Sequence, residues 1–235
     1  TLDGTYGPTE LNDGIISTDG VSVYYDSKTL LLNDDGMLSS REKDTKDYYV
    51  FAYGKNYVLG INNFYKLTGM PPLVPRYALG NWWSRYYPYT EQTYKALMTR
   101  FEEEKLPFTV AVIDMDWHYT DPGRGGWTGW TWNKSLFPNP QKFMSYLKDN
   151  DLKVTVNLHP AEGFDHYESV FPALSKSLGR DASDKSRIEW INSDKKFMTN
   201  MFEQVLHPMQ KEGVDFWWLD WQQHIFDTKL PKLNN

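Results

Sequence analysis

After residue 75 the chain alternates regularly between strand and helix patterns, and this order narrows the possible folds more than any other feature. Short apolar runs predict strands, and the longer segments between them predict helices. Alternating strands and helices form a parallel sheet with right-handed crossovers. The expected strands are residues 77–82, 108–113, 153–158 and 216–219, and the expected helices are residues 90–105, 139–149 and 194–212, the last kinked at Pro208.

Polar and aromatic residues follow each expected strand. The carboxyl ends of parallel strands carry the chemistry in (β/α)8 barrels and in doubly wound open sheets. No glycine-rich phosphate loop follows the first strand, so the barrel is favoured. The clusters are Asn81-Trp82-Trp83-Ser84, Asp114-Met115-Asp116-Trp117-His118, Asn157-Leu158-His159-Pro160 and Asp220-Trp221-Gln222-Gln223.

The first 70 residues have a different character. Three apolar runs separated by turn-forming residues predict short strands at residues 21–25, 29–32 and 48–53. A helix over residues 57–67 is expected to begin after Asn56 and to stop at Gly69. Pro71-Pro72 and Pro75 indicate a linker, so the expected division is residues 1–70 and 71–235.

Composition excludes several classes of function. The net charge is −6 with no basic stripe, so a nucleic-acid partner is not expected. The chain has no cysteine, which excludes disulfides and thiolate metal sites, and no apolar run approaches the 18 residues of a membrane span. The 10 Trp, 16 Tyr and 12 Phe suit carbohydrate, because sugar C–H faces lie flat on aromatic rings. A large aromatic core would explain many of them equally well.

Asp220 closes the apolar, aromatic run Phe216–Leu219. A carboxylate at the end of a buried strand is held rigidly and is partly desolvated, which suits a nucleophile or an acid. Asp114, Asp116 and His118 alternate, so in an extended segment they would share one face and could bind a divalent metal. The alternative is one sugar-binding carboxylate with structural polar neighbours, and no metal or other cofactor is expected.

The chain resembles glycoside hydrolase family 31, the retaining α-glucosidases and α-xylosidases, from about Tyr48 to Gln223. The resemblance implies the first half of a (β/α)8 barrel, preceded by the tail of a β-sandwich domain. Three segments carry it in family-like order: Leu79–Tyr86, Pro107–Trp117 and Gly213–Asp220.

The resemblance also implies roles for individual residues. Asp220 corresponds to the catalytic nucleophile, and Asp114 to the carboxylate that holds the sugar hydroxyls. Asn157 and His159 are assigned to the pocket because they lie where the third expected strand opens into the site. The remaining expected pocket residues are Trp82, Met115, Trp218 and Trp221.

The segment after the nucleophile departs from the family pattern. Trp221-Gln222-Gln223 stands where the family usually has Met-Asn-Glu, which removes a carboxylate near Asp220. A common α-glucoside is therefore not assumed, and an α-galactoside or an N-acetylated α-galactosaminide stays open.

Retaining hydrolysis needs a second carboxyl group about 5–5.5 Å from the nucleophile. Only Asp227 follows Asp220, and it is too close in sequence to belong to another barrel strand. We therefore expect a fragment that has the nucleophile without the acid/base, needs the rest of the barrel or a second chain, and is nearly inactive alone. A non-catalytic carbohydrate-binding protein on a decayed barrel, or a metal-dependent barrel hydrolase, is the alternative.

Overall fold

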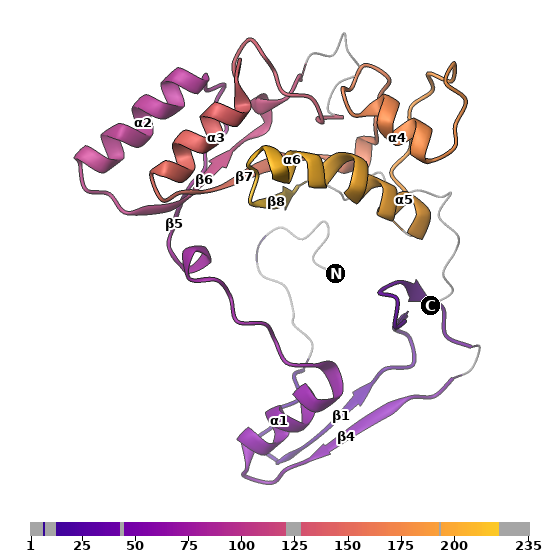
Figure 1. The fold of residues 1–235 in the computed structure, drawn as a ribbon. Coiled ribbons are helices and arrows are strands. Elements are labelled where there is room, and N and C mark those ends of the chain that lie inside the picture. The colour runs from indigo at the N-terminus through magenta and orange to yellow at the C-terminus, as the bar shows by residue number, and fades with distance from the viewer. Residues whose placement is uncertain (1–6, 8–12, 43–44, 121–127, 193, 221–235) are drawn as a thin grey trace. The chain divides into compact units, whose positions relative to one another are not determined.

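The computed structural model describes residues 7, 13–42, 45–120, 128–192 and 194–220 (Figure 1). The described residues form two compact units, one up to Leu73 and one from Val74 onward. The first contains two small antiparallel sheets, and the second contains one parallel sheet of four strands.

The first unit contains two antiparallel strand pairs, one inserted between the strands of the other, followed by one helix. Strand β1 (Val21–Tyr25) pairs with β4 (Tyr48–Ala52), β2 (Leu31–Leu32) pairs with β3 (Leu38–Ser39), and helix α1 spans Tyr57–Thr68. The Asn56 side chain accepts a hydrogen bond from the backbone N–H of Leu59 (3.0 Å), which caps the helix as expected. Gly69 ends it with a φ of +86°, a value that favours glycine.

The second unit is built on the expected parallel sheet. Its strands lie in the order of the sequence: β5 (Asn81–Trp83), β6 (Phe108–Ile113), β7 (Lys153–Leu158) and β8 (Phe216–Leu219). Sequential parallel neighbours joined by helices are the repeating arrangement of a (β/α)8 barrel. The carboxyl ends of all four strands therefore meet at one edge.

The first expected strand, residues 77–82, is wrong in its N-terminal part. Residues Arg76–Leu79 form a short 3-10 helix, η1, and extended pairing starts only at Asn81. The N–H groups of Ala78 and Gly80 donate to backbone oxygens three residues earlier, which turns the chain before it enters the sheet. A side chain at Gly80 would meet the Thr109 side chain at 2.3 Å, so only glycine allows this close approach to β6.

The helices begin where capping residues predict. Thr90 and Thr93 form a reciprocal capping pair at the start of α2 (Glu91–Glu103), and Asn139 caps α3 (Pro140–Asp149), whose first residue is proline. Three further helices are α4 (Phe171–Ser177), α5 (Lys195–Met201) and α6 (His207–Glu212). Helix α4 was not predicted from the sequence.

A π-helical segment, η5 (Phe202–Leu206), joins α5 to α6. Pro208 has no backbone N–H to donate, and the His207 N–H reaches back five residues to the Phe202 oxygen. The irregularity expected at Pro208 is thus a widened turn just before it.

One face of the parallel sheet packs against the helices and forms the hydrophobic core. Ala111, Ile113, Val154, Val156 and Leu158 are 0–2% exposed and belong to the same cluster as side chains of α3 and α6 (Phe143, Met144, Leu147 and Met209). The helical cover is visible in Figure 1. This arrangement leaves the opposite face of the strands for the site.

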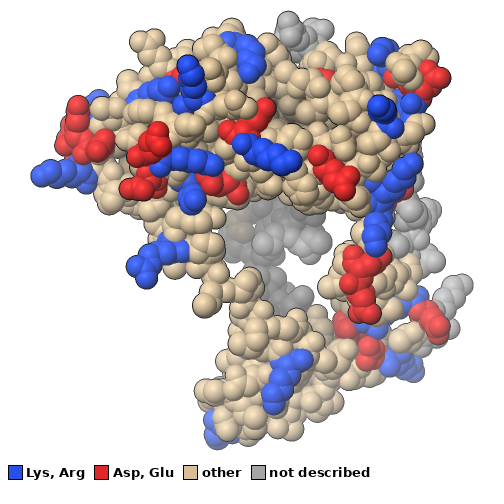
Figure 2. Space-filling model, in the orientation of Figure 1, with Lys and Arg blue, Asp and Glu red and all other residues tan. Residues whose placement is uncertain are grey.

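Charged side chains of both signs are interspersed on the face drawn in Figure 2, with no large basic patch over the helices. Within the described part of the chain, no helix combines the length and apolar character needed to cross a membrane.

Candidate active site at the carboxyl ends of the strands

The strand register places alternate residues of β6, β7 and β8 on the face that the helices do not cover. Thr155 lies opposite Phe216, and Asn157 lies opposite Trp218. Paired residues of a parallel sheet project to the same side, and successive residues project to opposite sides. One face therefore carries Val112, Thr155, Asn157 and Trp218, and it continues into the loop residues Asp114, His159 and Asp220.

Asp220 is held at the edge of this face by strand β7. Its backbone N–H donates to the Leu158 oxygen (2.9 Å), which extends the β7–β8 ladder by one bond. Its Oδ2 accepts a hydrogen bond from the Asn157 side-chain amide (3.1 Å). The side chain is 37% exposed, so the carboxylate is fixed at its base and accessible from solvent.

Asp114 follows β6 and is only 9% exposed. Its Oδ1 accepts the backbone N–H of Met115 (2.8 Å) at the start of a 3-10 turn, η2 (Met115–Trp117). Burial raises the pKa of Asp114, and the negative charges of Asp220 and Asp116 act in the same direction. The electrostatic coupling to Asp220 indicates that the two carboxyl groups share one environment.

His159 follows β7 and has its Nε2 3.9 Å from Asp220 Oδ2, beyond hydrogen-bonding distance. Burial lowers the pKa of His159, although the carboxylates of Asp220, Asp114 and Glu162 oppose this shift. The ring is therefore neutral near pH 7, and the contact with Asp220 is polar rather than an ion pair.

Aromatic side chains lie on the same face of the sheet. Trp82 is 44% exposed, and its ring meets that of Phe216 edge-on with centroids 5.3 Å apart. Trp218 and Met115 are half-buried. Trp221, Gln222, Gln223 and Asp227 lie outside the described residues.

A buried carboxylate that the sequence analysis did not identify, Glu168, connects two loops. Glu168 is 2% exposed and accepts hydrogen bonds from the hydroxyls of Thr128 and Thr131 and from the backbone N–H of Trp130 (3.3 Å). These partners follow β6, whereas Glu168 follows β7. Burial is the main cause of its raised pKa. No local sequence signal distinguishes Glu168 from a solvated loop residue.

A metal site does not form from Asp114, Asp116 and His118. The segment folds into the η2 turn instead of extending, so the three side chains do not share one face. His118 is fully buried, and its Nδ1 donates to the Tyr119 carbonyl (2.8 Å), since a carbonyl only accepts. Across the residues with described positions, no group of three His, Asp or Glu side chains is placed to hold a metal ion.

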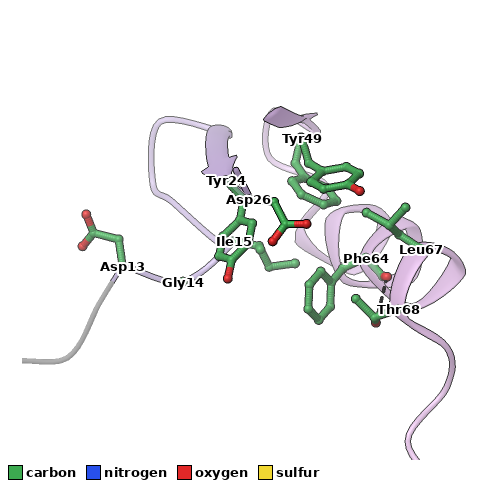
Figure 3. Close-up of a pocket in the computed structure, with 10 residues that line it drawn as sticks. Asp13, Gly14, Ile15, Tyr24, Asp26, Tyr49, Phe64, Leu67 and Thr68 are labelled. Carbon is green, nitrogen blue, oxygen red and sulfur yellow. Dashed lines mark hydrogen bonds between the residues drawn. The ribbon is translucent and has the colours of Figure 1, made fainter. Parts of the chain in front are cut away.

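A hollow of about 640 Å³ lies in the first unit between β1, β4 and α1 (Figure 3). Its walls are mainly apolar and include Ile15, Tyr24, Tyr49, Phe64 and Leu67. Two carboxylates line it: Asp26 is engaged by Arg41 (2.6 Å), and Asp13 points away from the other labelled side chains in Figure 3. Its two carboxyl groups therefore do not converge with a histidine, as Asp114 and Asp220 do with His159 at the edge of the parallel sheet.

A family model for the glycosyl hydrolases family 31 TIM-barrel domain matches residues 71–234. The chain belongs to glycosyl hydrolase family 31. Its parallel sheet, built from alternating strands and helices, and the carboxylates at the ends of its strands agree with membership in this family of hydrolases.

Two similar proteins are named as α-glycosidases. The α-xylosidase of Saccharolobus solfataricus is 26% identical over 219 residues, covering 88% of this chain and 27% of that protein. α-Glucosidase 2 of Bacillus thermoamyloliquefaciens is 27% identical over 199 residues, covering 74% of this chain and 24% of that protein. The chain thus spans 27% and 24% of the lengths of these two relatives.

The fold of the family is also found among solved structures. The xylosidase from Aspergillus niger superposes with a TM-score of 0.59 at 16% identity, covering 87% of this chain and 30% of that chain. At this identity the similarity supports the TIM-barrel fold, of which the four parallel strands described here form part.

Proposed function

We propose that this chain carries the nucleophile of a retaining α-glycosidase, and that Asp220 is this nucleophile. The observation that supports the proposal is the setting of Asp220: a half-exposed carboxylate anchored by β7 and flanked by Asp114 and His159. Its oxygen would attack the anomeric carbon and displace the leaving group, and water would then hydrolyse the glycosyl ester.

Asp114 is proposed to hold the sugar that is cleaved. A carboxylate that accepts hydrogen bonds from two hydroxyls fixes the orientation of the ring, because charge-assisted bonds are stronger than neutral ones. Its burial and its electrostatic interaction with Asp220 support this role, because the bonds would then form close to the reacting carbon. Neutral His159 is a further donor or acceptor for the same ring.

The walls of the sugar pocket are proposed to be apolar. Trp82 is exposed on the open face of the sheet and offers a ring on which sugar C–H groups can lie. Met115 and Trp218 are half-buried beside Asp114 and Asn157. Trp221 is proposed for the same wall because it directly follows Asp220 in the sequence.

The acid/base carboxyl group is proposed to come from outside the described residues. Asp114 is assigned to sugar binding, and the family relatives are about four times as long as the matched segment. The rest of a barrel, on the same or a second polypeptide, would supply the group. Residues 1–235 alone would then turn over little substrate.

The substrate is proposed to be a terminal α-glycoside whose sugar is set by the residues around Asp114 and Asp220. The two relatives named above are an α-xylosidase and an α-glucosidase, so both sugars belong in a test. The galacto and N-acetylgalactosamine configurations belong there as well, because Gln222 and Gln223 replace charged or amide residues of the usual pattern.

A fluorinated glycosyl inactivator tests the assignment directly. The protein in its full-length context would be incubated with α-configured 5-fluoro glycosyl fluorides of these sugars, digested and analysed by mass spectrometry. The expected result is one sugar attached to the peptide that contains Asp220, with no adduct in Asp220→Asn. Asp116→Asn, which alters a neighbouring carboxylate, should still be labelled. Labelling of another residue, or of none with any of these sugars, would contradict the proposal.

A further inference from the structure

Asn157 occupies an unusual place for a polar residue. It lies near the end of β7 with no solvent exposure, between the core residues Val156 and Leu158. Its side chain projects from the sheet face opposite to those two and reaches Asp220, where the amide nitrogen donates to Oδ2 over 3.1 Å. A sugar in the pocket cannot touch a side chain that is fully enclosed in this way.

The oxygen of the Asn157 side-chain amide lacks the hydrogen bond that its nitrogen makes. Its Oδ1 is buried and has no hydrogen-bond partner within the described part of the protein. A buried polar atom without a partner destabilises the folded state, and an apolar residue of similar size would avoid this. Local stability alone therefore does not explain an asparagine at this position.

The backbone of Asn157 is fixed independently of its side chain. Its carbonyl oxygen accepts the indole N–H of Trp117 (2.7 Å), and it lies opposite Trp218 in the β7–β8 ladder. The strand that carries the amide is thus tied on both sides. The amide nitrogen is held at a set place relative to Asp220, whose own N–H bonds to the next residue of the same strand.

We infer that Asn157 is a positioning residue that fixes the rotation of the Asp220 carboxylate through its side-chain amide. The inference rests on the proposed function of Asp220 as nucleophile. A carboxylate that attacks a carbon atom must be aligned before the reaction, and misalignment slows the step without affecting the fold. The amide aligns Asp220 without contacting the sugar.

The neutrality of the donor also matters. A cationic side chain at the position of the Asn157 amide would stabilise the Asp220 carboxylate more strongly and make it a poorer nucleophile. A carboxyl group at that position would instead share a proton with Asp220 at low pH. The titratable groups that interact electrostatically with Asp220 from the neighbouring loops are Asp114 after β6 and His159 after β7. Asp116 acts on Asp114, and Glu162 acts on His159. Replacing the amide by a carboxylate therefore adds one negative charge to a site with two.

Two substitutions and one matched control test the inference in the full-length protein. Asn157→Leu removes both the donor and the buried Oδ1, and Asn157→Asp keeps the shape but adds a charge. Thr155→Val is the control, because Thr155 lies on the same strand and face, is also fully buried and has a hydroxyl without a partner among the described residues. The measurements are the rate of covalent labelling by the sugar fluoride that labels the wild type, its pH dependence, and the melting temperature.

Asn157→Leu is expected to melt within a few degrees of Thr155→Val but to be labelled about 100- to 1000-fold more slowly, the range for deletion of one aligned donor. In Asn157→Asp the acid limb of the labelling rate is expected to move upward by about one pH unit or more, because two adjacent carboxyl groups share a proton. If Asn157→Leu does not fold, the shift in Asn157→Asp decides alone.

Two results would overturn the inference. One is an unchanged labelling rate in Asn157→Leu together with an unchanged pH profile in Asn157→Asp, while the wild type is labelled at Asp220. The other is a wild type that is not labelled at Asp220, which would refute the proposed function itself. The first result leaves Asp220 as the nucleophile and removes only the role of Asn157.

Discussion

Trp117 and Asn157 are joined by a hydrogen bond from the indole N–H to the backbone carbonyl, 2.7 Å long and fully buried. The β6–β7 ladder ends at the pair Ile113–Val156, one residue before this carbonyl. The indole therefore replaces the next backbone donor, and a loop side chain closes the sheet at the edge where Asp220 lies.

Trp117→Phe is expected to lower the free energy of unfolding by about 2–4 kcal/mol. The loss has two causes: the buried Asn157 carbonyl is left without a donor, and the smaller ring leaves part of the indole space empty. Trp132→Phe is the matched control. Trp132 packs against Trp117 with centroids 4.8 Å apart, but its buried indole N–H has no acceptor within the described residues. Urea denaturation followed by fluorescence measures both, and equal losses would show that the hydrogen bond contributes nothing.

A second prediction concerns the loop after β7. Gly163 has a φ of +71°, and a Cβ there would lie 2.2 Å from the backbone oxygen of Ile188. Phe164 and Ile188 exchange two backbone hydrogen bonds (2.8 and 2.9 Å), so moving Ile188 breaks a bridge between the loops. Gly163→Ala introduces both backbone strain and this steric clash. It is therefore expected to lower the unfolding free energy by at least about 2 kcal/mol more than a glycine-to-alanine substitution that introduces backbone strain alone.

Gly179→Ala supplies that comparison. Gly179 has a similar φ of +80°, but its added Cβ would meet only the flexible end of Lys196 at 3.9 Å. Its expected cost is about 1–2 kcal/mol, the usual penalty for a left-handed alanine. Thermal melting of the two variants separates steric conflict from backbone strain, and an equal decrease in melting temperature would contradict the clash.

Elements determined by local sequence patterns were predicted well, whereas elements that depend on contacts distant in the sequence were not. Strands β6, β7 and β8 and helices α2 and α3 were predicted nearly to the residue, because apolar runs and local capping residues determine them. The start of the first strand was wrong because a turn before Gly80 depends on a close contact with Thr109 on another strand. Helix α4 was missed because no capping side chain marks its start.

In the candidate site, too, residues placed by local sequence patterns could be predicted, and residues placed by long-range contacts could not. Asp114, His159 and Asp220 could be proposed from the sequence because each directly follows a strand of a parallel sheet. Which side of the sheet Asn157 occupies depends on the register with β8, and its burial depends on packing from other elements. Glu168 could not be singled out, because its partners are 37 to 40 residues away in the sequence.

Asp114→Asn tests the proposed sugar-binding role of Asp114, because it removes one charge and little volume. The expected loss in kcat/KM is about 10- to 150-fold, corresponding to the 1.5–3 kcal/mol of a charge-assisted hydrogen bond. The reference is Asp116→Asn, a half-buried carboxylate in the same loop, with a change of no more than a few-fold. Hydrolysis of an aryl α-glycoside by the full-length protein measures both, and equal losses in the two variants would remove the special role of Asp114.

The last prediction concerns pH and His118. Burial lowers the pKa of His118 to about 4, whereas its ordinary value is 6.5. Between these values the unfolded chain binds more protons than the folded protein, so the unfolding free energy falls as the pH drops from 6.5 toward 4. The full loss is about 3 kcal/mol, at 1.36 kcal/mol for each pKa unit. Glu168 and Asp114 act in the opposite direction, because their pKa values are raised and the folded state holds their protons.

A difference measurement isolates the histidine from these carboxyl groups. His118→Asn retains a side-chain N–H for the Tyr119 carbonyl and does not titrate. The wild type is expected to lose about 3 kcal/mol more unfolding free energy than His118→Asn between pH 7 and pH 4, measured by urea denaturation at each pH. The carboxyl contributions are common to both proteins and cancel in the difference. A difference that stays constant over this range would mean that His118 accepts its proton in the folded protein as readily as in the unfolded chain.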